Sequence, residues 1–256
     1  MGFRIHFGCA DLARTTIGRT PDPLWEVLLG MHMLQTEDEP SVFGAWRQRA
    51  RAKLTELERE LLVLAPPVGY SPDFLTPAAS VNGLDAGLAA VAATPQHQLE
   101  NELRRLSGEV CLPGWTRRLA AGDPGVLKKV CEGLRHFHRT KIAPQLPSMS
   151  PTIARDVKLH SDTVTTGGFE KRAKTLHPAM QWGPPVLHVD MRHINRDLYL
   201  RGRGLRLVPS FSCWPHPIMP ARVLHRTGLV TTRRAGNAVR HTISPIGTHI
   251  LTGTQA

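Results

Sequence analysis

The spacing of hydrophobic side chains predicts helices along most of the first 180 residues. Apolar residues recur every three or four positions over residues 22–34 and again over residues 41–64, which is the period of a helix with one buried face. A capping residue followed by proline, as at Asp22, Thr94 and Asp123, favours the start of a helix. We therefore expect a compact helical region joined by short loops.

Alternation of apolar and polar positions predicts a small antiparallel sheet. Residues 3–7 alternate in this way, and the same period returns at residues 186–189, 198–200 and 205–208. The Gly202-Arg203-Gly204 segment is a candidate tight turn between the last two strands, and the N-terminal strand can join the sheet. The predicted fold class is α+β, with a mainly helical N-terminal domain that carries one small antiparallel sheet.

After residue 219 the pattern changes to a short helix followed by a basic hairpin. Residues 220–227 predict the helix, and Gly228 ends it. Two strands, residues 229–234 and 238–244, flank a turn at residues 235–237. The order of helix, glycine and basic hairpin is typical of the end of a recognition helix followed by the wing of a winged-helix domain.

The stretch of residues 222–244 resembles the ArsR-type winged-helix transcriptional regulators. Further segments are similar to the large N-terminal region found in one subgroup of these regulators: residues 4–7, 22–26, 73–77 and 197–214. The resemblance implies a cytoplasmic helix-turn-helix protein that binds DNA and regulates transcription. It also implies a homodimer whose N-terminal region dimerises or responds to a small-molecule effector.

The resemblance also implies which side chains contact DNA. They are the polar residues of the helix end and the wing: Arg222, Arg226, Thr231, Thr232, Arg233, Arg234, Asn237 and Arg240. A complete winged helix needs roughly 60 to 80 residues, whereas residues 215–220 supply three prolines in six positions and no supporting helix. The predicted domains are therefore 1–214, regulatory or dimerising, and 215–256, a partial winged-helix segment. We expect this segment to contact the phosphate backbone rather than to read base edges.

The charge distribution favours the same partner. The formal net charge is +11, and no Asp or Glu follows Asp197. Eight arginines lie in that stretch: Arg201, Arg203, Arg206, Arg222, Arg226, Arg233, Arg234 and Arg240. Because guanidinium groups make forked hydrogen bonds to phosphate and guanine, this surplus favours DNA. A solvated hairpin edge protected by charge is the alternative interpretation of the wing arginines.

Other kinds of chemistry have little support in the sequence. No nucleophile elbow, Walker loop or metalloprotease motif is present, so we predict neither an enzyme nor a cofactor. His136 and His138 lie two positions apart and point to different sides of a predicted helix, which favours a surface pair over a metal site. The four cysteines lack metal-binding spacing and no secretory pattern opens the chain, so we expect reduced, mostly buried thiols in the cytoplasm. No apolar run reaches the ~20 residues of a membrane span, so we expect no membrane partner.

A second function stays open. The chain could be a ligand-binding or protein-interaction module that has lost DNA binding. A deep apolar pocket near Trp182 and Trp214 would favour that alternative, because these side chains flank the predicted sheet.

Overall fold

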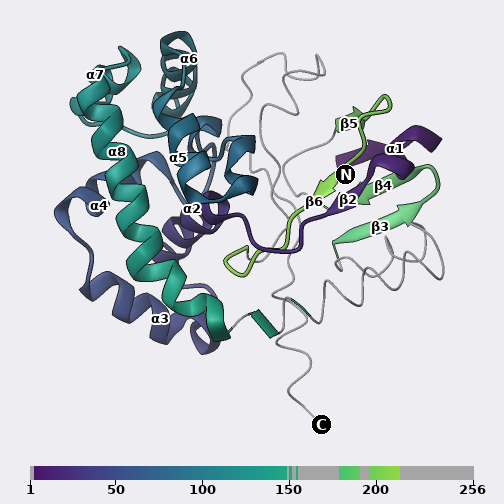
Figure 1. Cartoon of the computed structure of the whole chain (residues 1–256), viewed down its shortest axis with the longest axis horizontal. Helices are drawn as coiled ribbons and strands as arrows, with labels where there is room; N and C mark the ends of the chain where they lie inside the picture. Colours follow the sequence, from purple (N-terminus) through teal and green to yellow (C-terminus); the bar gives the residue numbers. More distant parts are fainter. Residues whose placement is uncertain (1–2, 149, 152–153, 155–178, 191–195, 214–256) are drawn as a thin grey trace. The chain divides into compact units, whose positions relative to one another are not determined.

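The computed structural model describes residues 3–148, 150–151, 154, 179–190 and 196–213 (Figure 1). These residues divide into two compact units. A helical unit consists of Asp22–Pro147, and a sheet unit contains the described parts of Met1–Pro21 and Ser148–Ala256. The region expected as one domain, residues 1–214, therefore contains parts of both units, and residues 215–256 lie outside the described residues.

The helical unit is built from short helices with a buried apolar core. Its α-helices are α2 (Pro23–Leu34), α3 (Pro40–Ala52), α4 (Glu56–Leu61), α5 (Leu84–Ala92), α6 (Gln96–Ser107), α7 (Trp115–Ala120) and α8 (Pro124–Phe137). Short turns of other helix types are η1 (Leu62–Leu64), η2 (Asp73–Leu75), η3 (Ala78–Asn82), the π-helical η4 (His138–Ile142) and η5 (Ala143–Gln145). Helix α8 packs against α2, α4 and α5, as Figure 1 shows.

Two of the three expected caps are confirmed. The Asp22 carboxylate accepts hydrogen bonds from the Leu24 and Trp25 amides, and Asp123 holds the start of α8 in the same way. Thr94 is a wrong prediction, because α6 begins after Pro95 and the Thr94 hydroxyl donates to the Ala90 carbonyl of the preceding helix. A threonine can therefore close one helix instead of opening the next.

The expected continuous helix over residues 41–64 is broken in two. Helix α3 ends at Ala52, and Thr55 starts α4. The Thr55 hydroxyl accepts from the Glu58 amide, and the Glu58 carboxylate accepts from the Thr55 amide at 2.9 Å. This capping box satisfies two amides that a helix start would leave unpaired, so a new start is more favourable here than continuation.

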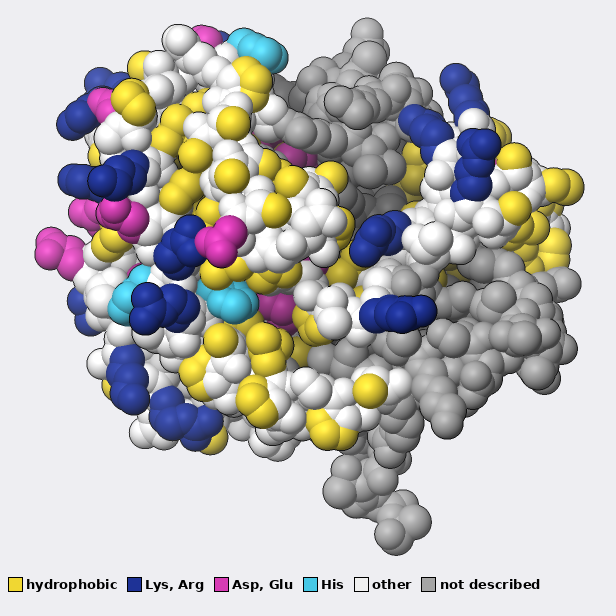
Figure 2. Space-filling view, in the orientation of Figure 1, with side chains coloured by type: hydrophobic (Ala, Val, Ile, Leu, Met, Phe, Trp, Pro, Cys, Tyr) yellow, Lys and Arg dark blue, Asp and Glu magenta, His cyan; other side chains and the backbone are white. Residues whose placement is uncertain are grey.

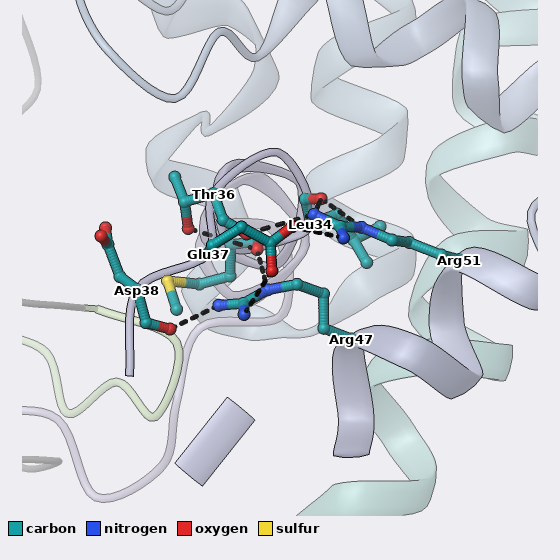
Figure 3. A network of polar contacts seen from close by, with 7 residues as sticks. Leu34, Thr36, Glu37, Asp38, Arg47 and Arg51 are labelled. Atoms are coloured by element: carbon teal, nitrogen blue, oxygen red, sulfur yellow. Dashed lines mark hydrogen bonds and ion pairs between the residues drawn. The ribbon is translucent and has the colours of Figure 1, made fainter. Parts of the chain in front are cut away.

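Two arginines of α3 hold the end of α2 (Figure 3). The last carbonyls of a helix lack partners within it. Arg47 donates to the carbonyls of Met33 and Asp38, and Arg51 donates to those of Leu34 and Thr36. Glu37 lies beside both guanidinium groups, 2.6 Å from that of Arg51. Only 2% of Arg47 is exposed, so its guanidinium group interacts with the fold and not with solvent.

The sheet unit confirms the α+β prediction. Its four-stranded sheet has the order β3 (Met180–Gly183), β4 (Val186–Val189), β1 (Phe3–His6) and β5 (Arg196–Tyr199). Helix α1 (Cys9–Arg14) follows β1, and β2 (Thr16–Ile17) pairs with β6 (Arg206–Leu207). The sheet is mixed, because β1 runs antiparallel to β4 and parallel to β5. Period-two patterning fixes which face is buried and says nothing of strand direction, so the expected antiparallel arrangement was right for only part of the sheet.

One face of this sheet is the core of the unit and the other is polar. The buried face is formed by Phe3, Ile5, Met180, Leu187, Val189 and Leu198. Strand alternation places Arg4, His6, His188, Asp197 and Tyr199 on the opposite face. That polar face belongs to strands whose inner side chains are fixed by packing, so its groups have a rigid support.

No helix in the described part of the chain is both long enough and apolar enough to cross a membrane.

Candidate functional site

All of the predicted DNA contacts lie outside the described residues. These are Arg222, Arg226, Thr231, Thr232, Arg233, Arg234, Asn237 and Arg240, and they stay predictions. Trp214 also lies outside them, whereas Trp182 packs edge-on against Phe7 at 5.3 Å beside the core of the sheet unit. The packing of Trp182 makes it part of a core and gives no support to a pocket there.

The described residues do contain a basic turn, residues 200–204, that joins β5 to β6. We call it the arginine turn. Arg201, Gly202 and Gly204 have φ values of 52°, 80° and 73°. A Cβ on Gly204 would lie 2.5 Å from the Arg14 carbonyl oxygen, so only glycine fits at this position. The predicted tight turn at residues 202–204 is therefore confirmed.

A buried carboxylate from α1 fixes the arginine turn. Asp11 is 2% exposed, and its two oxygens accept from the amides of Gly204 at 3.0 Å and Gly8 at 2.8 Å. Burial alone would raise the pKa of Asp11, but the amides of Gly204, Gly8 and Gly202, with a smaller contribution from the positive charge of Arg203, more than offset it, so the pKa is lowered. Asp11 is thus ionised at neutral pH, and backbone dipoles supply most of what stabilises its charge.

Two arginine side chains are anchored on the carbonyls of the same segment. Arg14 donates to the Gly202 carbonyl at 2.6 Å, while Arg203 donates to the carbonyls of Leu200 and Tyr199 at 2.8 and 3.1 Å. Arg14, Arg201 and Arg203 are all exposed, and none forms an ion pair with a carboxylate among the described residues. Figure 2 shows Lys and Arg side chains gathered over α1 and the turn after β5.

Such an arrangement is suited to anionic oxygen ligands. A guanidinium group has five N–H donors, so an arginine held by one or two carbonyls keeps donors for a ligand. Anchoring also removes part of the rotamer freedom that a long side chain would otherwise lose on binding. The arginine turn therefore presents positive charge in a partly pre-organised form.

A polar cluster lies on the outer face of β1 and β5. Arg4 donates to both oxygens of Asp197 at 2.8 and 2.7 Å, and His6 Nε2 lies 2.6 Å from Asp197 Oδ1. These hydrogen bonds, from Arg4 first and His6 second, hold the pKa of Asp197 well below its usual range. The His6 ring stacks on the Tyr199 ring with a centroid distance of 4.2 Å and an interplanar angle of 13°.

The helical unit contains a separate titratable cluster, which is buried. Lys141 Nζ lies 2.6 Å from both oxygens of Glu58, and His136 Nδ1 lies 2.9 Å from Glu58 Oε1. Burial alone would raise the pKa of Glu58, but Lys141, the Thr55 amide and His136 lower it. Glu58 and Lys141 are both buried, so this pair acts within the fold and not on a ligand.

Metal and thiol chemistry find little support in the described part of the chain. No three His, Cys, Asp or Glu side chains are grouped there as metal ligands. His136 is exposed and His138 half-buried, so the expected surface pair is only partly right. The expectation of mostly buried thiols is wrong, because Cys9 and Cys111 are exposed, Cys131 is half-buried and only Cys213 is buried.

Sequence reasoning missed most of the residues that build the arginine turn. It identified Gly202, Arg203 and Gly204 but gave no role to Asp11 or Arg14. Asp11 contacts Gly204 across a separation of 193 residues, and no local pattern marks such a contact.

A comparison of the chain with known protein families, curated proteins and solved structures finds no match.

Proposed function

We propose that this protein is a DNA-binding transcriptional regulator related to the ArsR-type winged-helix proteins. One observation carries the proposal: from residue 198 to residue 256 the chain holds eight arginines and no acidic residue, and its sequence pattern predicts a short helix, a glycine and a basic hairpin. Cations without neighbouring carboxylates attract an anionic polymer and are not neutralised within their own segment.

The described part of this segment is consistent with that role. Arg201, Arg203 and Arg206 are the arginines of the segment that the structure describes, and all three are exposed. Arg14 adds a fourth exposed cation beside the arginine turn through its bond to the Gly202 carbonyl. These side chains are available to phosphate groups, which orient a protein on a duplex without reading its sequence.

The roles follow from the predicted elements. In the proposal, Arg222 and Arg226 contact DNA from the short helix, and Arg233 and Arg234 contact phosphates from the wing. Residues 215–220 have no room for the supporting helices, so phosphate contacts dominate and discrimination between sequences is modest. The rest of the chain dimerises or responds to an effector.

The test is a titration of the full chain against duplex DNA from its own promoter at several salt concentrations, read by fluorescence anisotropy. We expect the affinity to fall steeply with salt, with a slope of log K against log salt of about −0.9 per phosphate contacted. Replacing Arg233 and Arg234 with glutamine should lower the magnitude of this slope by about two. Absence of salt-sensitive binding at every concentration would contradict the proposed function.

A matched control removes the same charge elsewhere. Arg49 and Arg59 are exposed residues of α3 and α4 in the helical unit. The variant carrying Arg49→Gln and Arg59→Gln changes the net charge by the same amount as the wing variant. An equal loss of affinity in both variants would show that net charge alone, and not the C-terminal segment, is responsible.

A further inference from the structure

The outer face of the sheet ends in an aromatic ring that is open on one side. Tyr199 is 48% exposed although it lies within a strand. Strand β5 is the last strand of the four-stranded sheet, and its neighbour β1 covers Tyr199 from one side through the His6 ring. The stack therefore uses the ring face directed at β1, and the face directed away from β1 has no neighbouring strand in the described sheet.

The partners of His6 hold this ring pair in place. His6 stacks on Tyr199 and contacts Asp197, and Asp197 is held by two hydrogen bonds from Arg4. The parallel register sets Arg4 opposite Asp197 and His6 opposite Tyr199. Because Arg4 and His6 satisfy the Asp197 carboxylate, its charge repels a nearby phosphate less than that of an unpaired aspartate would.

The ring adjoins the arginine turn directly. Tyr199 is the last residue of β5, and its carbonyl accepts a hydrogen bond from the Arg203 guanidinium. Tyr199 is thus followed directly by the arginine turn, and the exposed Arg203 reaches back to the Tyr199 backbone, while the exposed Arg14 is bound to the Gly202 carbonyl of the same turn. Single-stranded nucleic acids are bound by this combination, in which a base stacks on an aromatic ring and cations follow the backbone.

We propose that Tyr199 and the arginine turn form a binding site for single-stranded DNA. One base stacks on the exposed face of Tyr199, and neighbouring phosphates contact Arg201, Arg203 and Arg14. The inference rests on the proposed function for the choice of DNA as the partner. It goes beyond that function by assigning a strand-binding site to the sheet unit, separate from the C-terminal segment.

A strand fits this surface better than a free nucleotide. Pockets for small molecules enclose most of the ligand surface. Tyr199 is 48% exposed on the edge strand of the sheet, and the exposed arginines belong to both α1 and the arginine turn. Open faces gain affinity from several successive bases and phosphates, so an extended strand uses this surface more fully than a mononucleotide does.

The experiment is a fluorescence anisotropy titration of the full chain with a labelled ten-residue oligothymidylate. Replacing Tyr199 with leucine should weaken binding roughly 5- to 150-fold, the range expected for loss of one stacked base. Tyr199→Phe keeps the ring and should bind within about twofold of the parent chain. Equal affinity of the leucine variant and the parent would overturn the stacking site.

The arginine turn is tested with the same strand. Arg201→Gln combined with Arg203→Gln should weaken binding and lower the magnitude of the salt slope by roughly 1.4, about 0.7 for each phosphate contact. The control pair Arg49→Gln and Arg59→Gln should leave both quantities unchanged. Equal effects of the two pairs would overturn a site at the turn.

A measurement on the unaltered chain tests the site even if the variants fail to fold. Photocrosslinking of a DNA strand substituted with 5-bromo-2′-deoxyuridine should label the peptide that contains Tyr199. Labelling confined to residues 214–256 would overturn the site even if the strand binds. Tighter binding of the corresponding uridine ribonucleotide strand would overturn DNA as its occupant, and tighter binding of thymidine monophosphate than of the strand would overturn the extended site.

Parallel titrations with duplex DNA separate this inference from the proposed function. Duplex binding together with a strand affinity that is indifferent to Tyr199 would overturn the site and leave the regulator intact. Strand binding that depends on Tyr199, with no duplex binding at any salt concentration, would support the site and overturn the proposed function.

Discussion

Each of the two units contains a pair of arginines that bind backbone carbonyls, and the two pairs differ in their acidic neighbours. In the helical unit, Arg47 and Arg51 bind the carbonyls at the end of α2, and the Glu37 carboxylate lies beside both guanidinium groups (Figure 3). In the sheet unit, Arg14 and Arg203 also bind backbone carbonyls and are exposed, and neither forms an ion pair with a carboxylate among the described residues. Hydrogen bonds from a guanidinium group to backbone carbonyls therefore satisfy the end of α2 in the helical unit. In the sheet unit they hold an exposed arginine side chain in place.

The buried carboxylates of the two units, Glu58 and Asp11, are stabilised by different kinds of group. Glu58 of the helical unit is neutralised chiefly by Lys141, so the pair contributes no net charge. Asp11 of the sheet unit is stabilised chiefly by backbone amides. The Asp11 carboxylate is bound by amides and not by a guanidinium group, although the positive charge of Arg203 also lowers its pKa. A buried carboxylate can thus order a basic turn through amide hydrogen bonds, without forming an ion pair with its arginines.

The largest expected loss of stability follows from breaking the buried ion pair between Glu58 and Lys141. Glu58→Leu leaves the Lys141 ammonium buried without its partner, which should lower the free energy of unfolding by about 3–5 kcal/mol. Urea unfolding, monitored by tryptophan fluorescence, measures this free energy. Glu132→Gln is the control, because its contact with Lys128 is exposed and 3.9 Å long, and should cost less than about 0.5 kcal/mol. Similar losses in the two variants would contradict an internal role for Glu58.

Adding Lys141→Met to Glu58→Leu sharpens the same prediction. The double variant has no unpaired buried charge, so it should recover most of the lost stability. A double variant less stable than Glu58→Leu alone would show that Lys141 stabilises the fold through contacts other than Glu58.

The next largest loss of stability is expected from the buried arginine, Arg47. Arg47→Met leaves the carbonyls of Met33 and Asp38 without their donor, and we expect a loss of about 3 kcal/mol. Hydrogen exchange should show faster exchange in α2 and α3, with DNA affinity unchanged. Arg49→Met, at an exposed position of the same helix, should change stability by less than about 0.5 kcal/mol. A loss of DNA affinity in the folded Arg47 variant would break the proposed contrast between the units.

A smaller loss of stability is expected at Asp11, whose carboxylate is bound by backbone amides in the sheet unit. Asp11→Asn replaces one accepting oxygen with an N–H group that faces a backbone donor, and should cost about 2 kcal/mol. Hydrogen exchange should accelerate at Gly8 and Gly204, and DNA binding should weaken although the positive charge has increased. The control is Asp190→Asn, which makes the same charge change at an exposed residue. Stronger binding by both variants would contradict a positioning role for Asp11.

The smallest effect is a dependence of stability on pH. The pKa values of Asp11, Asp197 and Glu58 are lower in the folded chain than their ordinary values of about 4. Each group binds its proton more readily when unfolded, so its contribution is complete above about pH 5 and is lost as the pH falls through the folded pKa. Urea midpoints should therefore decrease below about pH 4, and less so for Asp11→Asn. Midpoints that rise on acidification would contradict this assignment.

Local patterns predicted the elements better than the contacts between them. The helical period found α2 and α8, and the Asp-Pro pairs located their first residues, because both signals act within a few positions. Thr55 and Glu58 carried a readable capping signal that would have separated α3 from α4. The parallel pairing of β5 and the bond from Gly204 to Asp11 join distant segments, and no local period encodes them. The predicted DNA contacts from Arg222 to Arg240 lie outside the described residues.

The most direct test of the account compares two pairs of arginines on the same full-length chain. Duplex DNA affinity is measured from about 50 to 300 mM salt for the parent, for Arg201→Gln with Arg203→Gln, and for Arg49→Gln with Arg59→Gln. The account predicts that the first pair lowers the magnitude of the salt slope by about two and that the second leaves it unchanged. Equal slopes for the two variants would contradict the claim that the sheet unit presents its arginines to DNA.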